Sequence, residues 1–82
     1  MYKIEITNRA VRDIERLDLV TKKRIGERLK LFSVNPLNYA KKLTNPKIGS
    51  YRFRVGDFRI VFDIEGESIV ILRVGHRSSI YK

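Results

Sequence analysis

The amino-acid sequence predicts an α+β fold of the order β-α-α-β-β-β, in which a two-helix hairpin packs on one face of a mainly antiparallel sheet. The spacing of the apolar residues supports this prediction. Apolar and polar residues alternate over residues 2–6, apolar residues recur with helical period over 9–32, and alternation returns from residue 51. With 82 residues, the chain is expected to form a single domain that spans 1–82.

The helical segment is predicted to contain two short helices with one apolar stripe each. Thr7 or Asn8 can cap the first helix and Asp18 the second, because these side chains accept a hydrogen bond from a free backbone N–H. Asn35-Pro36 ends the second helix, since proline disfavours helical geometry in the residue before it. The stripes consist of Ala10, Ile14 and Leu17 in the first helix and of Val20, Ile25, Leu29 and Phe32 in the second.

Three strands are predicted after a loop that covers residues 35–49. Gly56-Asp57 is typical of a two-residue hairpin turn, and the tripeptide at 65–67 is typical of the next turn. Residues 68–74 are apolar on both faces, which indicates a strand in the middle of the sheet.

Strand alternation predicts two different faces for the hairpin at 51–62. Aromatic and aliphatic side chains pack on the helices from one face, which places Arg52, Arg54 and Arg59 together on the other. Three like charges this close repel one another unless an anion lies among them. We therefore interpret these arginines as a binding site for phosphate groups.

The charge balance agrees with a polyanionic target. Eighteen Lys and Arg residues stand against nine Asp and Glu residues, which gives a formal net charge of +9. The surplus lies in the second half of the chain, where Lys41, Lys42 and Lys47 are further candidates for binding RNA or phosphate. A small domain with this excess is drawn to nucleic acids.

Residue types that are missing exclude several kinds of chemistry. The sequence has no cysteine and one histidine, so disulfides, thiolate zinc sites and cysteine nucleophiles are excluded, and no metal or other cofactor is expected. No stretch approaches the roughly 20 apolar residues of a membrane span. We therefore expect a cytoplasmic protein that does not contact the membrane.

The end of the chain carries side chains suited to cleavage of a phosphodiester in RNA. His76 can take or give a proton near neutral pH, Arg77 can hold a phosphate with two hydrogen bonds, and Tyr81 can stack on a base or act through its hydroxyl. Such cleavage deprotonates the 2′-OH, stabilises a pentacoordinate phosphate and protonates the 5′-oxygen.

The order of the elements and two runs, Tyr51–Phe62 and Val74–Tyr81, resemble the RelE/ParE toxin superfamily over essentially the whole chain. The RelE-like branch, which we favour, consists of ribosome-dependent endoribonucleases that cut mRNA through a 2′,3′-cyclic phosphate. The resemblance implies that Arg59 holds the scissile phosphate and that Arg77 and Tyr81 occupy the positions of the basic residue and the tyrosine at the end of those toxins. Those toxins also carry basic residues, often lysines, where this chain has Arg52 and Arg54. Arginine stays protonated, so His76 or Tyr81 would be the base.

The ParE-like branch is the alternative, because its toxins inhibit DNA gyrase and have no hydrolytic site of their own. Both branches are held inactive by an antitoxin that is encoded beside the toxin. The resemblance therefore implies a cognate antitoxin as one partner. The other partner would be the ribosome with its mRNA, or gyrase.

Overall fold

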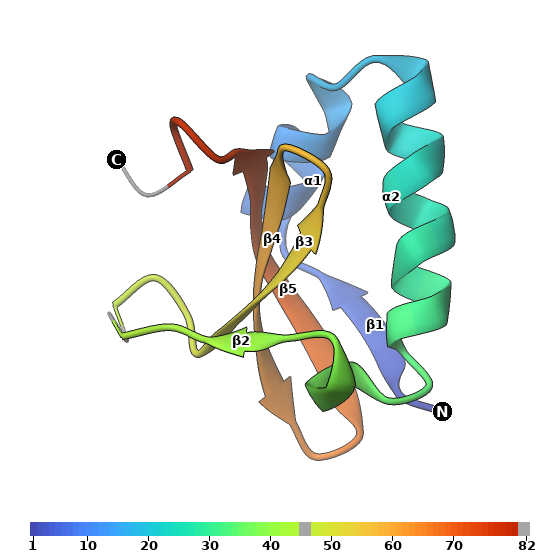
Figure 1. The fold of residues 1–82 in the computed structure, drawn as a ribbon, viewed down its shortest axis with the longest axis vertical. Helices are drawn as coiled ribbons and strands as arrows, with labels where there is room; N and C mark the ends of the chain where they lie inside the picture. Colours follow the sequence, from blue (N-terminus) through green and yellow to red (C-terminus); the bar gives the residue numbers. More distant parts are fainter. Residues whose placement is uncertain (45–46, 81–82) are drawn as a thin grey trace.

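A computed structural model describes residues 1–44 and 47–80, and it contains a five-stranded sheet of order β1-β5-β4-β3-β2. Two helices cover one face of this sheet, with the long helix α2 standing along its side (Figure 1). This arrangement confirms the predicted α+β fold class. In chain order the elements are β1 (Lys3–Ile6), α1 (Asn8–Glu15), α2 (Leu19–Phe32), the short 3-10 helix η1 (Pro36–Asn38), β2 (Lys41–Lys42), β3 (Tyr51–Val55), β4 (Phe58–Glu65) and β5 (Ser68–His76).

The sheet is antiparallel except at one edge, where β1 pairs in parallel with β5. The prediction of a loop throughout residues 35–49 was wrong at Lys41 and Lys42, which form β2 against Tyr51 and Arg52. A strand of two residues is too short to show an alternating pattern, so only its pairing partner reveals it.

Both predicted hairpin turns are confirmed. Gly56 and Gly66 each occupy the first position of a two-residue connection and have φ of 60°. The residues that follow them, Asp57 and Glu67, have negative φ, as in a type II′ turn. Each glycine adopts the left-handed backbone that side-chain-bearing residues avoid, so the sequence fixes both turns.

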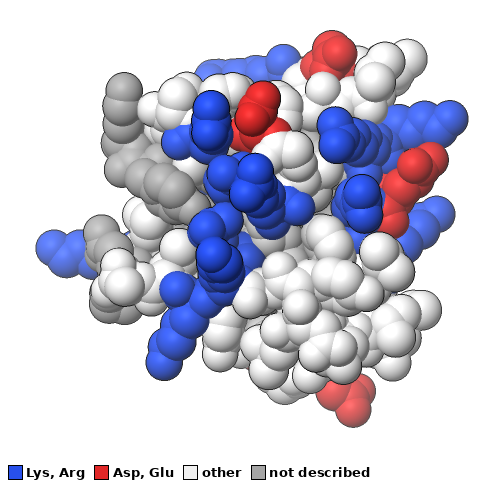
Figure 2. All heavy atoms as spheres, in the orientation of Figure 1, with Lys and Arg blue, Asp and Glu red and all other residues white. Residues whose placement is uncertain are grey.

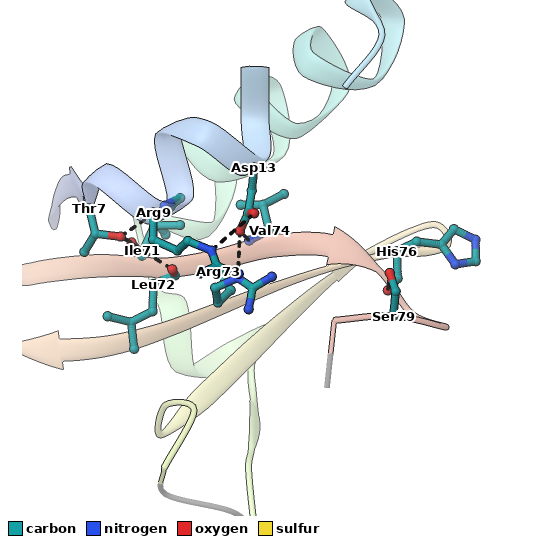
Figure 3. A network of polar contacts seen from close by, with 10 residues as sticks. Thr7, Arg9, Asp13, Ile71, Leu72, Arg73, Val74, His76 and Ser79 are labelled. Carbon is teal, nitrogen blue, oxygen red and sulfur yellow. Dashed lines mark hydrogen bonds and ion pairs between the residues drawn. The ribbon is translucent and has the colours of Figure 1, made fainter. Parts of the chain in front are cut away.

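The predicted helix caps are also in place. Thr7 Oγ1 accepts the backbone N–H of Ala10 at 3.3 Å, and Asp18 Oδ1 accepts that of Thr21 at 3.2 Å. Thr7 Oγ1 also donates to the carbonyl of Ile71 at 2.8 Å (Figure 3). One hydroxyl therefore starts α1 and attaches it to the central strand β5.

The core lies between the helices and the sheet. Phe53 is fully buried, and its ring centroid lies 4.1 Å from that of Phe62 and 4.5 Å from that of Phe32. The predicted stripes are confirmed with one exception, since Val20 is 75% exposed. Val20 precedes Ile25 by five residues, a spacing that turns it about 140° away from the stripe.

The opposite face of the sheet is partly covered by the connection between β2 and β3. Gly49 lies against Val61 and Leu72 with φ of 149°, and a Cβ atom there would stand 2.5 Å from Val61 Cγ1. Val61 pairs with Arg73 and Phe62 pairs with Ile71, so Leu72 is the extra residue of a β-bulge in β5. This bulge exchanges the two faces of β5 beyond Leu72.

Candidate nucleic-acid interface

The β3–β4 hairpin brings two of the predicted arginines directly opposite each other. Arg54 pairs with Arg59, and Arg52 lies two residues earlier on the same face of β3. Lys and Arg side chains gather in the middle of the face shown in Figure 2, over this part of the sheet. Like charges opposed across two strands destabilise a sheet, which favours a bound anion at this surface. We refer to Arg52, Arg54 and Arg59 as the arginine face.

Arg59 is held firmly within the arginine face. Its Nη1 donates to the carbonyl oxygens of Gly56 at 3.0 Å and of Phe58 at 3.1 Å, and the residue is only 9% exposed. Burial of a guanidinium is tolerated when such acceptors satisfy it. Arg59 therefore presents a positive charge in a fixed position, whereas its neighbour Arg54 is exposed.

Two further arginines lie at the turn of the same hairpin, Arg77 and Arg24. The backbone N–H of Arg77 donates to the carbonyl of Asp57 at 2.8 Å, and Arg77 Nε lies 3.7 Å from Asp57 Oδ1. From α2, Arg24 reaches the turn, because its Nη1 lies 3.3 Å from where a Cβ of Gly56 would stand. The sequence did not reveal Arg24, since a basic residue beside a helical apolar stripe reads as an ordinary solvated side chain.

His76 is not brought together with Arg54 and Arg59. It pairs with Phe58 on the core side of β4, and the two rings meet edge to face with centroids 5.7 Å apart. The bulge at Leu72 causes this placement, because it moves residues 74 and 76 to the helix-covered face. Strand β5 therefore places His76 on the face of the sheet opposite the arginine face, and the predicted cluster of the two does not form there.

The ring of His76 is oriented by the turn that follows it. His76 Nδ1 accepts the backbone N–H of Ser78 at 3.1 Å and lies 2.8 Å from Ser78 Oγ. A backbone N–H can only donate, so the neutral ring that accepts it carries its proton on Nε2. His76 is exposed at the end of β5, with its ring pointing away from the sheet (Figure 3).

The turn at residues 77–80 folds back over the arginine side of the sheet. The N–H of Ile80 donates to the carbonyl of His76 at 3.0 Å, and the side chain of Ile80 is buried over Gly75. Gly75 pairs with Arg59, so this turn borders the arginine face. Tyr81, a predicted catalytic residue, lies outside the described residues.

The predicted lysines are distributed around β2. Lys41 pairs with Arg52 and therefore shares its side of the sheet, whereas Lys42 pairs with Tyr51 and faces the other side. Both are exposed, as is Lys47 in the loop before β3. Lys41 thus extends the arginine face toward the sheet edge.

Within residues 1–44 and 47–80, no three His, Cys, Asp or Glu side chains are grouped so that they could hold a metal ion. In the same residues, no helix combines the length and apolar character needed to cross a membrane.

This small basic α+β fold is shared with toxins of toxin–antitoxin systems. The sequence model described as "ParE toxin of type II toxin-antitoxin system, parDE" matches residues 4–81, and the chain belongs to this family. Toxin RelG of Mycobacterium tuberculosis is 32% identical over 88 residues, which cover 99% of this chain and 97% of RelG. The protein is thus a type II toxin with RelE-like homologues.

Solved structures agree with this assignment. The toxin–antitoxin complex RelBE2 of M. tuberculosis contains a chain that superposes with a TM-score of 0.83 at 30% identity, covering 93% of this chain and 98% of that one. The RelB–RelE antitoxin–toxin complex of Methanococcus jannaschii gives a TM-score of 0.74 at 29% identity, with 95% of each chain covered. The fold of this chain is therefore that of RelE toxins.

Proposed function

We propose that this toxin is a ribosome-dependent endoribonuclease that cleaves mRNA and so inhibits translation in the cytoplasm. The observation that carries the proposal is the cross-strand pair of the exposed Arg54 and the largely buried Arg59, near Arg77, which contacts the turn of the same hairpin. Similarity to Toxin RelG over nearly the whole chain and to Toxin RelE3 over 31 residues supports it.

The proposed reaction needs no metal ion. The 2′-oxygen loses its proton and attacks the adjacent phosphorus, the bond to the 5′-oxygen breaks, and a 2′,3′-cyclic phosphate forms as the 5′-oxygen gains a proton. Arg59 would hold the scissile phosphate, with Arg54 and Arg77 stabilising the added negative charge. Arg52, Lys41, Lys42 and Lys47 would contact neighbouring phosphates.

The proton transfers are proposed for His76 or Tyr81. The Nδ1 of His76 accepts the N–H of Ser78, so its Nε2 would exchange the proton with substrate. The ring lies on the face opposite Arg59, so RNA would have to pass around the end of β5 to meet both. Ribosome dependence fits this requirement, because the ribosome would impose that path on the mRNA.

Inhibition of DNA gyrase is the second candidate function. It is favoured by the match to the ParE family over residues 4–81 and by the separation of His76 from the arginine face. In this case the arginines would bind gyrase or its DNA without chemistry.

A cognate antitoxin is proposed as the physiological partner, as in the complexes of the two structural relatives. The net charge of +9 fits an acidic antitoxin segment. Exposed apolar side chains from the last turn of α2 to the residue after η1 form a surface that could bind an amphipathic helix, namely Leu31, Val34, Leu37 and Tyr39. Failure to co-purify with the product of an adjacent gene would count against this partner.

Primer extension on a defined mRNA bound to ribosomes tests the ribonuclease. New 5′ ends within the A-site codon are expected with the toxin and not with Arg77→Ala, whose exposed side chain contributes little to stability. If a folded toxin that stops growth leaves the mRNA intact, and inhibits supercoiling by purified gyrase instead, the second candidate holds.

A further inference from the structure

Helix α1 carries a second group of arginines that lies apart from the arginine face. Arg9, Arg12 and Arg16 are spaced so that they lie on one side of the helix. Together with Asp13 they line a pocket of about 190 Å³. Every residue that lines this pocket is charged, so its chemistry suits an anion and not an apolar ligand.

Asp13 is engaged elsewhere and compensates little of this charge. Its Oδ2 accepts Arg73 Nε at 2.9 Å and the backbone N–H of Val74 at 3.0 Å, and its side chain is 10% exposed (Figure 3). Arg9 Nε is more distant, at 3.9 Å from Oδ1. The carboxylate therefore attaches α1 to β5 and neutralises Arg73.

The remaining charge is costly for so short a helix. Arg12 in the last turn of α1 and Arg16 at its C-cap are four residues apart, and like charges at this spacing repel each other. Neither guanidinium has a hydrogen bond or ion pair within residues 1–44 and 47–80. A helix of 8 residues has little intrinsic stability with which to offset the repulsion. A bound anion would relieve it.

We infer that the α1 pocket is a second phosphate-binding site, which takes a backbone phosphate of RNA while the arginine face holds the scissile one. This inference rests on the proposed action on RNA. Guanidinium groups match phosphate with paired hydrogen bonds. Asp13 attaches the pocket to Val74, three residues before Arg77, whereas Arg59 on the neighbouring strand β4 faces the side of the sheet opposite the helices. One RNA-containing target that passes around the end of β5 would contact both surfaces.

Binding of the isolated toxin, measured without reference to cleavage, tests the inference. The double variant Arg12→Gln/Arg16→Gln is compared with Lys23→Gln/Arg28→Gln, which removes the same charge from exposed positions of α2. The probes are mRNA-programmed ribosomes, by sedimentation, and a fluorescent single-stranded RNA oligonucleotide, both over a salt series. Circular dichroism verifies that each variant is folded.

The α1 variant is expected to bind RNA at least about tenfold more weakly than the wild type. Its plot of the log of the binding constant against the log of the salt concentration should have a slope smaller by about 1.4, because two phosphate contacts are lost. The α2 variant is expected to keep the wild-type slope. If the α1 variant loses affinity for ribosomes alone, the bound phosphate belongs to ribosomal RNA. If it loses affinity for both ribosomes and the oligonucleotide, the phosphate belongs to the mRNA strand. Equal RNA affinities of the α1 and α2 variants overturn the inference. An α1 variant that binds RNA like the wild type but binds the antitoxin more weakly overturns it as well. If the wild-type toxin binds RNA with this salt dependence but cleaves no mRNA, the proposed ribonuclease activity is refuted, whereas the phosphate-binding site on α1 is still supported.

Discussion

The two faces of the β3–β4 hairpin differ in what surrounds their side chains. On one face Phe53, Ile60 and Phe62 are fully buried against the helices, whereas on the other Arg54 is exposed opposite Arg59. The same backbone ladder supports both faces, and strand alternation separates them residue by residue. Stability therefore depends mainly on the first face, and the second is left for binding.

Phe53→Ala has the largest expected effect. It removes a ring that packs between Phe32 and Phe62, with centroid distances of 4.5 and 4.1 Å, and such truncations in a core cost about 3–5 kcal/mol. Urea unfolding followed by circular dichroism measures the loss. Leu37→Ala, at a position that is 55% exposed, is the control and is expected to change the unfolding free energy by less than about 0.5 kcal/mol. Equal losses in the two variants would contradict the assignment of the core.

Gly49→Ala is expected to cost about 1–3 kcal/mol, because the new Cβ meets Val61 Cγ1 at 2.5 Å in a backbone conformation with φ of 149°. It tests whether the loop before β3 is fixed on the arginine side of the sheet. Gly26→Ala in α2, where a Cβ meets nothing within 4 Å, is the control and is expected to stabilise the helix slightly. An unchanged unfolding midpoint for Gly49→Ala would show that this loop is not packed.

Asp18 is expected to make stability depend on pH in the acid range. The hydrogen bond from the Thr21 side chain, with a further one from the Thr21 backbone, lowers the pKa of Asp18 below its ordinary value of 3.8. The ionised cap therefore contributes stability above pH 3.8, and this contribution is lost as the pH falls through the lowered value. Thermal unfolding across this range, compared with Asp18→Asn, measures the effect. Identical pH profiles for the two proteins would refute it.

Arg54→Gln is expected to have the smallest effect on stability, within about 0.5 kcal/mol of wild type and in the stabilising direction, because it removes one of two opposed like charges. The same urea titration measures it. A loss as large as that of Phe53→Ala would mean that the arginine face is a structural element.

The sequence predicted those features that depend on local spacing. Alternation placed Arg52 and Arg54 on the face opposite Phe53, and the glycines at 56 and 66 fixed both turns. It did not predict the position of His76, because a strand that is apolar on both faces gives no sign of the bulge at Leu72.

Features that depend on tertiary contacts could likewise not be predicted from the sequence. Arg24 belongs to the hairpin turn only because α2 crosses β3 nearby, and β2 exists only through its pairing. Asp13, which lines the pocket on α1, is held by Arg73, a residue 60 positions away in the chain.

The claim that the arginine face carries the activity is tested most directly by growth arrest on induction of Arg52→Gln/Arg54→Gln, with Lys23→Gln/Arg28→Gln as the control of equal charge. We predict that the first variant loses the arrest while it accumulates as a folded protein, and that the control stops growth like the wild type. Full arrest by the first variant at an equal protein level would show that Arg52 and Arg54 are not needed for toxicity.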